Sequence, residues 1–148
     1  MKEIELDLFE LQSAAHLGIL RCLESIKHKE KWGYNYKGSL MQKFSHSISG
    51  ACAEAAVAKY LNIKFPYTCN HGSLPDLIYK DKKLQIRSQT TKVKNQNSLI
   101  IRPNAKKDEF YIFVQDEAPK FIIKGFINST VILENKKYWE EKYKKLSK

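Results

Sequence analysis

Four polar residues within the run from Gly50 to Thr91 have the types needed to act together on a phosphodiester: Glu54, Asp76, Gln85 and Arg87. Carboxylate and amide oxygens are ligands that Mg²⁺ and Mn²⁺ accept, and a guanidinium can hold a phosphate through parallel hydrogen bonds. A divalent cation at such a site activates a water molecule and stabilises the charge that develops on the phosphate. The residue types therefore predict a metal-dependent phosphodiester site, provided that the fold brings the four side chains together.

The first acid lies in a predicted helix. Glu54 stands in the alanine-rich stretch GACAEAAVAKYLN, whose composition favours a helix that can pack closely against its neighbours. We predict that this helix is capped by Ser45 or Ser47 and ends near Asn62. An acid among alanines could also lie on an exposed helix face, and only the other three residues favour a site.

The remaining three residues belong to a predicted β-hairpin. LPDLIYK and KLQIRSQTT read as two strands closed around Lys80 to Lys83, with Asp76 at the head of the first. Gln85 and Arg87 are two positions apart on the second strand, so their side chains leave the same face of the sheet. That face is either exposed to solvent or lines a cleft.

The rest of the chain predicts an α+β fold with α/β-like character, a single domain in which helices flank a central mixed β-sheet. Residues 1–45 form an N-terminal helical region, 46–130 the core and 131–148 a basic C-terminal helix. The elements expected outside the site are one or two amphipathic helices from Leu6 to about Lys29, a loop over 29–45, strands at SLIIRP, FYIFVQ and FIIKGFI, and a helix from Asn135.

Composition limits the classes of partner. The 148 residues are 43% hydrophobic and 11% aromatic, enough for an ordinary globular core. The net charge of +10 favours a polyanionic partner, although the same charges would also make a solubilising surface. Lys92, Lys94 and Arg102 are the candidates for contacts with a nucleic acid backbone.

The three cysteines, Cys22, Cys52 and Cys69, lack the spacing of a zinc site or a disulfide framework, and the first two are expected in the core. No apolar run is long enough to cross a membrane, and the acidic N-terminus does not read as a signal peptide. These features predict a protein of the cytoplasm.

The order of the site residues resembles the PD-(D/E)XK nuclease superfamily. The matching residues are Glu54 on a helix, Pro75-Asp76, and Gln85-Ile86-Arg87 on the following strand. Segments such as AAHLGILRCLESI, GACAEAAVAKYLN and FIIKGFI also resemble small bacteriophage proteins of unassigned function. The first resemblance implies a restriction-endonuclease-like fold, Mg²⁺ or Mn²⁺ as cofactor, DNA as substrate and, in many such nucleases, a homodimer.

The resemblance also implies a role for each residue. Asp76 would be the principal metal ligand, Gln85 a neutral co-ligand, Glu54 a direct or water-mediated ligand, and Arg87 the phosphate clamp. The superfamily has an acid where Gln85 stands and usually a lysine where Arg87 stands. Because an amide brings no negative charge, weaker metal binding is expected, and because a guanidinium stays protonated, Arg87 cannot act as a base.

Two classes of function remain open from the sequence. One is a divalent-metal-dependent DNA nuclease. The other is a catalytically inactive protein with a nuclease fold that binds nucleic acid or inhibits a replication or host-defence component; a structural role in the virion is a further alternative. Arg21 lies on the first predicted helix. It is expected either to be a structural polar group, at the surface or hydrogen-bonded in the interior, or to contact a phosphate.

Overall fold

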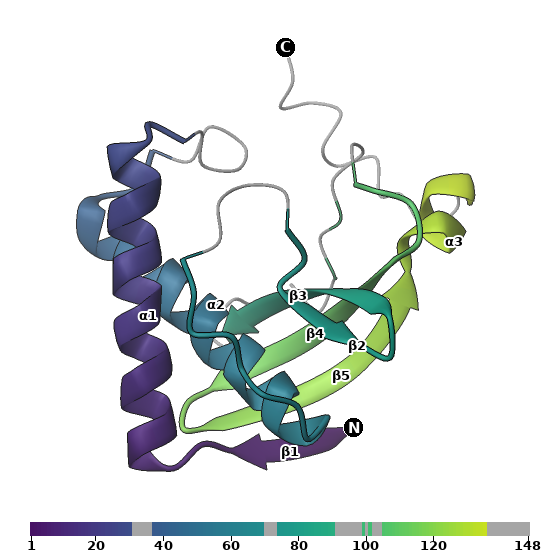
Figure 1. Cartoon of the computed structure of the whole chain (residues 1–148), viewed down its shortest axis with the longest axis horizontal. Helices are drawn as coiled ribbons and strands as arrows, with labels where there is room; N and C mark the ends of the chain where they lie inside the picture. Colours follow the sequence, from purple (N-terminus) through teal and green to yellow (C-terminus); the bar gives the residue numbers. More distant parts are fainter. Residues whose placement is uncertain (31–36, 70–73, 91–98, 100, 102–104, 136–148) are drawn as a thin grey trace.

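A computed structural model describes the chain except residues 31–36, 70–73, 91–98, 100, 102–104 and 136–148 (Figure 1). Its described part is a mixed α+β fold, as the sequence predicts. The elements in chain order are β1 (Lys2–Glu5), α1 (Leu8–Lys27), α2 (Leu40–Tyr60), β2 (Leu77–Tyr79), β3 (Lys82–Thr90), β4 (Glu109–Glu117), β5 (Lys120–Asn128) and α3 (Ser129–Glu134).

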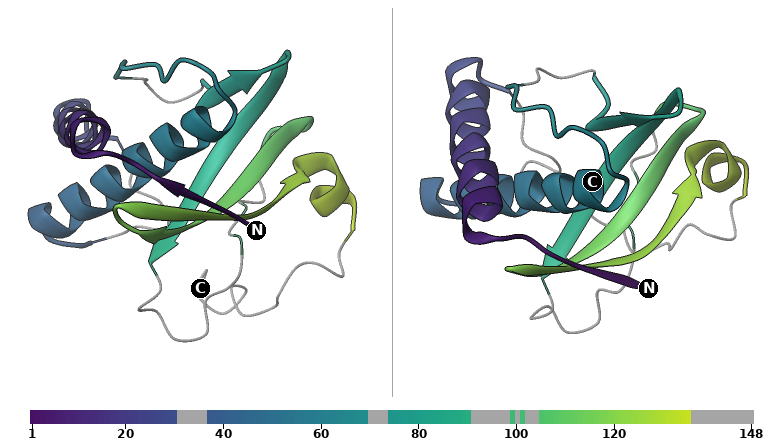
Figure 2. Two further views of the ribbon diagram at one scale, coloured as in Figure 1. Left: turned by 90° about the horizontal axis from the view of Figure 1, so that it is seen from below. Right: turned by 60° about the horizontal axis from the view of Figure 1, so that its bottom comes forward.

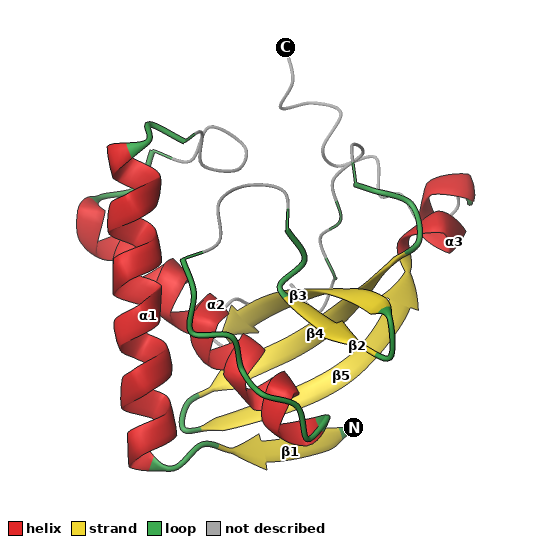
Figure 3. Ribbon diagram, viewed as in Figure 1, coloured by secondary structure: helices red, strands yellow, loops and turns green. Residues whose placement is uncertain are grey.

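Five strands form one sheet in the order β1-β5-β4-β3-β2 (Figure 3). The β3–β4 pair is parallel and the other three pairs are antiparallel, so the predicted mixed sheet is confirmed. The predicted hairpin is β2 and β3, while FYIFVQ and FIIKGFI form β4 and β5. The predicted strand at SLIIRP is wrong where the chain is described, since Leu99 and Ile101 lie in no strand.

The two long helices form two layers on one face of the sheet (Figure 2). Helix α2 lies against the strands, and α1 packs mainly against α2. Every residue from Ala51 to Ala58 is buried, so the alanine-rich stretch is the closely packed rod that its composition predicts. Cys22 and Cys52 are buried and unpaired, as expected. Among the described residues, no helix is long and apolar enough to span a lipid bilayer.

Helix α2 begins earlier than the sequence pattern indicates. The predicted caps Ser45 and Ser47 are wrong, because both lie inside the helix. The N-cap is Ser39, whose hydroxyl accepts a hydrogen bond from the backbone of Gln42 while the Gln42 side chain accepts one from the backbone of Ser39. This reciprocal capping box satisfies two backbone N–H groups at once, which a serine further along the chain would not do.

A glycine sets how closely the two helices approach. A methyl group on Gly18 of α1 would lie 2.6 Å from both the Cα of Ile48 and the carbonyl oxygen of Ser47 on α2. Because these are backbone atoms of a helix, they cannot move aside independently. Gly18 therefore allows α1 to seat against α2, which carries Glu54.

Replacing Gly18 with alanine is expected to lower the free energy of unfolding by about 3 kcal/mol, since the helices must separate to admit the methyl group. Gly50→Ala is the matched control, because nothing lies within 4 Å of a methyl group there. That variant should gain about 0.5–1 kcal/mol from better helix propensity. Urea unfolding measures both, and equal effects at the two glycines would contradict the close approach.

Candidate active site

Asp76 is held at the head of the β2–β3 hairpin by two backbone contacts. Its N–H donates to the carbonyl of Leu84 at 3.0 Å, and its Oδ2 accepts from the N–H of Ile86 at 2.7 Å. The side chain thus occupies a position in the hydrogen-bond ladder directly before β2 begins. Pro75 precedes it, and the ring restricts the φ of Pro75 itself to about −65°. The carboxylate position is consequently fixed by β3, the strand that carries Gln85 and Arg87.

Gln85 and Arg87 lie on the half-buried face of β3, as the alternation of the strand predicts, opposite the face of Ile86 and Ser88 that packs toward α2. Arg87 Nη1 donates to the Ile86 carbonyl at 2.8 Å and lies 3.6 Å from Asp76 Oδ2. Its Nη2 lies 3.5 Å from Gln85 Oε1. The guanidinium carbon lies 5.2 Å from the centre of the Tyr111 ring on β4, a cation–π contact. With 40% of its side chain exposed, Arg87 remains accessible to a ligand.

Glu54 is buried and paired with an arginine from the other helix. Arg21 Nη1 donates to Glu54 Oε2 at 2.6 Å, and the two side chains are 18% and 10% exposed. Arg21 Nε donates to the carbonyl of Thr68 at 3.1 Å, while its buried Nη2 has no hydrogen-bond partner among the residues that the structure describes. Arg21 is therefore an interior group that joins α1, α2 and the connection after α2; the structure leaves its predicted contact with a phosphate untested.

The two acids influence each other's ionisation. Burial is the main cause that raises the pKa of Glu54 to about 7; Asp76 raises it further, while Arg21 and Arg87 lower it. Burial also raises the pKa of Asp76 above its ordinary value, against the lowering effects of Arg87, the Ile86 N–H and Arg21. Both acids and both arginines therefore belong to one electrostatic cluster. We call Glu54, Asp76, Gln85, Arg87 and Arg21 the acid–arginine cluster.

The oxygen atoms of this cluster suit a hard divalent cation. The hydrogen bonds to Glu54 and Asp76 within the described residues use only Oε2 and Oδ2, which leaves Oε1 and Oδ1 available. Gln85 Oε1 adds a third oxygen, and carboxylates with amide oxygens are the ligands that Mg²⁺ and Mn²⁺ prefer. In the described ranges, no group of three or more His, Cys, Asp and Glu side chains is placed to hold a metal. The candidate ligands are two carboxylates and one neutral oxygen, and that oxygen, Gln85 Oε1, lies 3.5 Å from Arg87 Nη2.

No family model, curated protein or solved structure matches the chain. The resemblance to PD-(D/E)XK nucleases thus rests on the sequence residues Glu54, Pro75-Asp76 and Gln85-Ile86-Arg87. Helix-borne Glu54 and hairpin-borne Asp76 lie in one cluster, and the two β3 side chains are half-buried rather than turned fully into solvent.

The predicted backbone-contact residues lie outside the described part of the chain. Lys92, Lys94 and Arg102 fall in the gaps at 91–98 and 102–104, and the structure does not test their assignment. The predicted C-terminal helix from Asn135 falls largely in the last gap, since only its first residue is described and ends α3.

The structure adds two residues that the sequence pattern did not single out. Tyr111 pairs in register with Gln85, and Glu109, which is 3% exposed, pairs with Lys83. The Glu109 carboxylate contributes to the raised pKa of Asp76. Alternation along β4 could have placed Glu109 and Tyr111 on one face, but only the parallel pairing with β3 shows that this is also the face of Gln85 and Arg87.

Proposed function

We propose that this protein is a divalent-metal-dependent DNA nuclease with a PD-(D/E)XK-like site. The observation that supports this most is that Asp76 from the head of β2 and Arg87 from β3 both act electrostatically on Glu54 from α2, with Gln85 placed 3.5 Å from Arg87. The net charge of +10 is compatible with a polyanionic substrate. The order of these elements, together with a mixed sheet covered by helices, supports a restriction-endonuclease-like arrangement.

Asp76, Gln85 and Glu54 would hold Mg²⁺ or Mn²⁺ through their available oxygens. The bound cation would supply an activated water and charge neutralisation at the phosphate. Arg87, already oriented by the Ile86 carbonyl and Tyr111, would bind a nonbridging phosphate oxygen and stabilise the charge developing on it. Arg21 would hold Glu54 in place and favour its ionised form at neutral pH.

The test is incubation of the purified protein with plasmid DNA and with single-stranded DNA in Mg²⁺ or Mn²⁺. We expect cleavage that EDTA abolishes. Absence of cleavage of either substrate with both metals would reject the proposed hydrolysis.

Gln85→Glu should lower the Mn²⁺ concentration needed for half-maximal cleavage by about tenfold, because ligand charge sets the affinity of such sites. The matched control is Gln89→Glu, which adds the same charge to β3 four residues further along, about 13 Å away. A metal titration of the cleavage rate measures both variants. An identical response at the two positions would contradict the role of residue 85 as a metal ligand.

A second function is favoured by the ion pairs themselves. Arg21 and Arg87 already neutralise Glu54 and Asp76, and a charge-balanced cluster can be stable without a cation. On this account the protein would bind nucleic acid without cutting it, through phosphate contacts whose affinity falls steeply with salt. Binding unchanged by EDTA, together with no cleavage in Mn²⁺, would favour this function over hydrolysis.

A further inference from the structure

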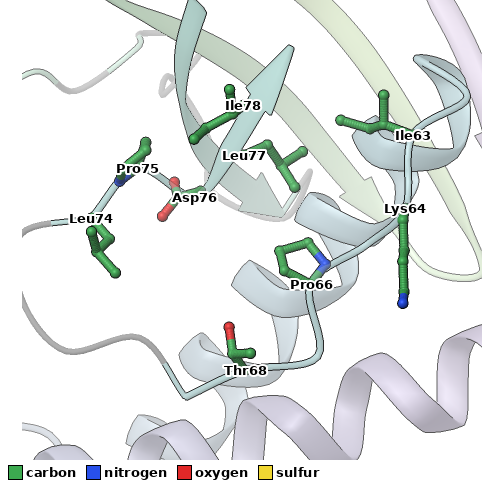
Figure 4. Close-up of a pocket in the computed structure, with 9 residues that line it drawn as sticks. All are labelled: Ile63, Lys64, Pro66, Thr68, Leu74, Pro75, Asp76, Leu77 and Ile78. Atoms are coloured by element: carbon green, nitrogen blue, oxygen red, sulfur yellow. The ribbon is translucent and has the colours of Figure 1, made fainter. Parts of the chain in front are cut away.

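A cleft of about 470 Å³ opens beside the acid–arginine cluster, between the connection that follows α2 and the head of β2 (Figure 4). Ile63 and Pro66 line one side, and Leu74 and Ile78 line the other. Asp76 is also part of the lining, and in Figure 4 its carboxylate lies on the side of Pro75 and Leu74. The cleft is therefore continuous with the proposed reaction site.

The cleft combines apolar walls with one cation and one carboxylate, those of Lys64 and Asp76. Leu74 and Ile78 are each 61% exposed, so both present aliphatic surface that a ligand in the cleft can cover. Thr68, also in the lining, has its carbonyl held by Arg21, which fixes that wall relative to Glu54. A fitting ligand has a flat apolar body close to a negative charge.

We propose that this cleft receives the base of an unpaired nucleotide, so that the protein prefers single-stranded DNA. The inference rests on the proposed function in one respect, namely that the adjoining phosphate lies at Arg87. The cleft volume falls within the range of about 300–1,000 Å³ typical of small-ligand sites. A base in a duplex is stacked and paired, and it must be extruded before it can enter such a site, which disfavours duplex DNA. Lys64 is placed to contact the backbone of the same strand.

The test is fluorescence anisotropy with labelled single-stranded and duplex oligonucleotides of equal length, in EDTA so that no hydrolysis occurs. We expect the wild type to bind the single strand about tenfold more tightly than the duplex, because a paired base must be extruded, at a cost in free energy, before it can enter the cleft. Ile78→Asp should remove most of this preference, because a carboxylate in the apolar wall repels both the base and its phosphate.

Met41→Asp is the matched control. Met41 is 72% exposed near the start of α2, and the cleft follows the other end of this 21-residue helix, about 30 Å away. The control removes an exposed aliphatic side chain and adds the same charge, so it corrects for a general effect on a polyanion. Leu74→Asp, at an equally exposed position, provides a second test should Ile78→Asp fold poorly.

Equal affinity for single strand and duplex, or equal binding by the variants at 78, 74 and 41, would overturn the inference. Single-strand preference that depends on Ile78 in a protein that cuts no DNA would reject the proposed hydrolysis and leave the cleft assignment standing. Cleavage of both DNA forms, with binding that is unchanged in Ile78→Asp, would support the proposed hydrolysis and reject the cleft assignment.

Discussion

Asp76→Asn is expected to reduce the rate of DNA cleavage by about a thousandfold or more, because it removes the charge of the proposed principal metal ligand. Asparagine has almost the same shape, and its Oδ1 can still accept the hydrogen bond from the Ile86 N–H that Asp76 accepts at 2.7 Å. The hairpin should therefore persist. Initial rates on plasmid DNA in Mn²⁺ measure the effect.

The control for this substitution is Asp81→Asn in the turn of the same hairpin. Asp81 is exposed and has a φ of 63°, a conformation that asparagine adopts readily. Its cleavage rate should match that of the wild type. Since burial raises the pKa of Asp76, removing that charge should leave stability at neutral pH unchanged or slightly higher. A rate within about tenfold of wild type in a folded Asp76→Asn protein would contradict the assignment of Asp76.

Arg21→Met is expected to lower the free energy of unfolding by about 3 kcal/mol at mildly alkaline pH, because it leaves Glu54 charged, buried and without its partner. The effect should shrink as the pH falls, since Glu54 can then take up a proton. The loss of Arg21 raises the pKa of Glu54 further above its wild-type value of about 7. Urea unfolding across the pH range measures the difference between the two proteins.

The direction in which stability changes with pH follows from proton linkage. The folded pKa of Glu54 exceeds its ordinary value of 4.5, so the folded state binds the proton more tightly than the unfolded state. Its contribution to stability is fully present below pH 4.5 and is lost as the pH rises through about 7. In Arg21→Met this loss should continue to higher pH.

The control is Arg21→Met combined with Glu54→Gln, which has no buried charge at this position and should recover much of the stability above pH 7. Arg21→Lys keeps a positive charge but lacks the guanidinium whose two nitrogens contact Glu54 and Thr68. An intermediate loss of unfolding free energy is therefore expected. An Arg21→Met deficit that is the same at all pH values would show that packing, rather than the charge of Glu54, causes it.

The elements predicted best are those whose pattern is local. The 3.6-residue spacing of apolar residues located the first helix, which spans Leu8–Lys27, and alternation located the β2–β3 hairpin. Strand β1, the short edge strand KEIE, was missed because its four residues carry three charges and its pairing with β5 lies at the far end of the sequence. Whether a short edge strand forms depends on the strand that it pairs with rather than on its own composition.

The candidate site was predictable in its acids but not in its arginine pairs. Glu54 and Asp76 stood out by type and order, whereas the Arg21–Glu54 contact joins residues 33 positions apart on two helices. Nothing in the local sequence of either helix indicates that Gly18 allows their close approach. Likewise, the parallel pairing of β3 with β4 brings Tyr111 against Arg87 through a long-range contact that no local pattern encodes.

The most direct measurement of the central claim is anomalous X-ray diffraction from crystals of the wild-type protein grown with Mn²⁺, compared with crystals of Asp76→Asn. We predict one strong anomalous peak in the wild type, in contact with Asp76 and adjacent to Glu54 and Gln85, and no peak there in the variant. A wild-type structure in which Arg21 and Arg87 keep their pairs and no manganese lies at Asp76 would contradict the account.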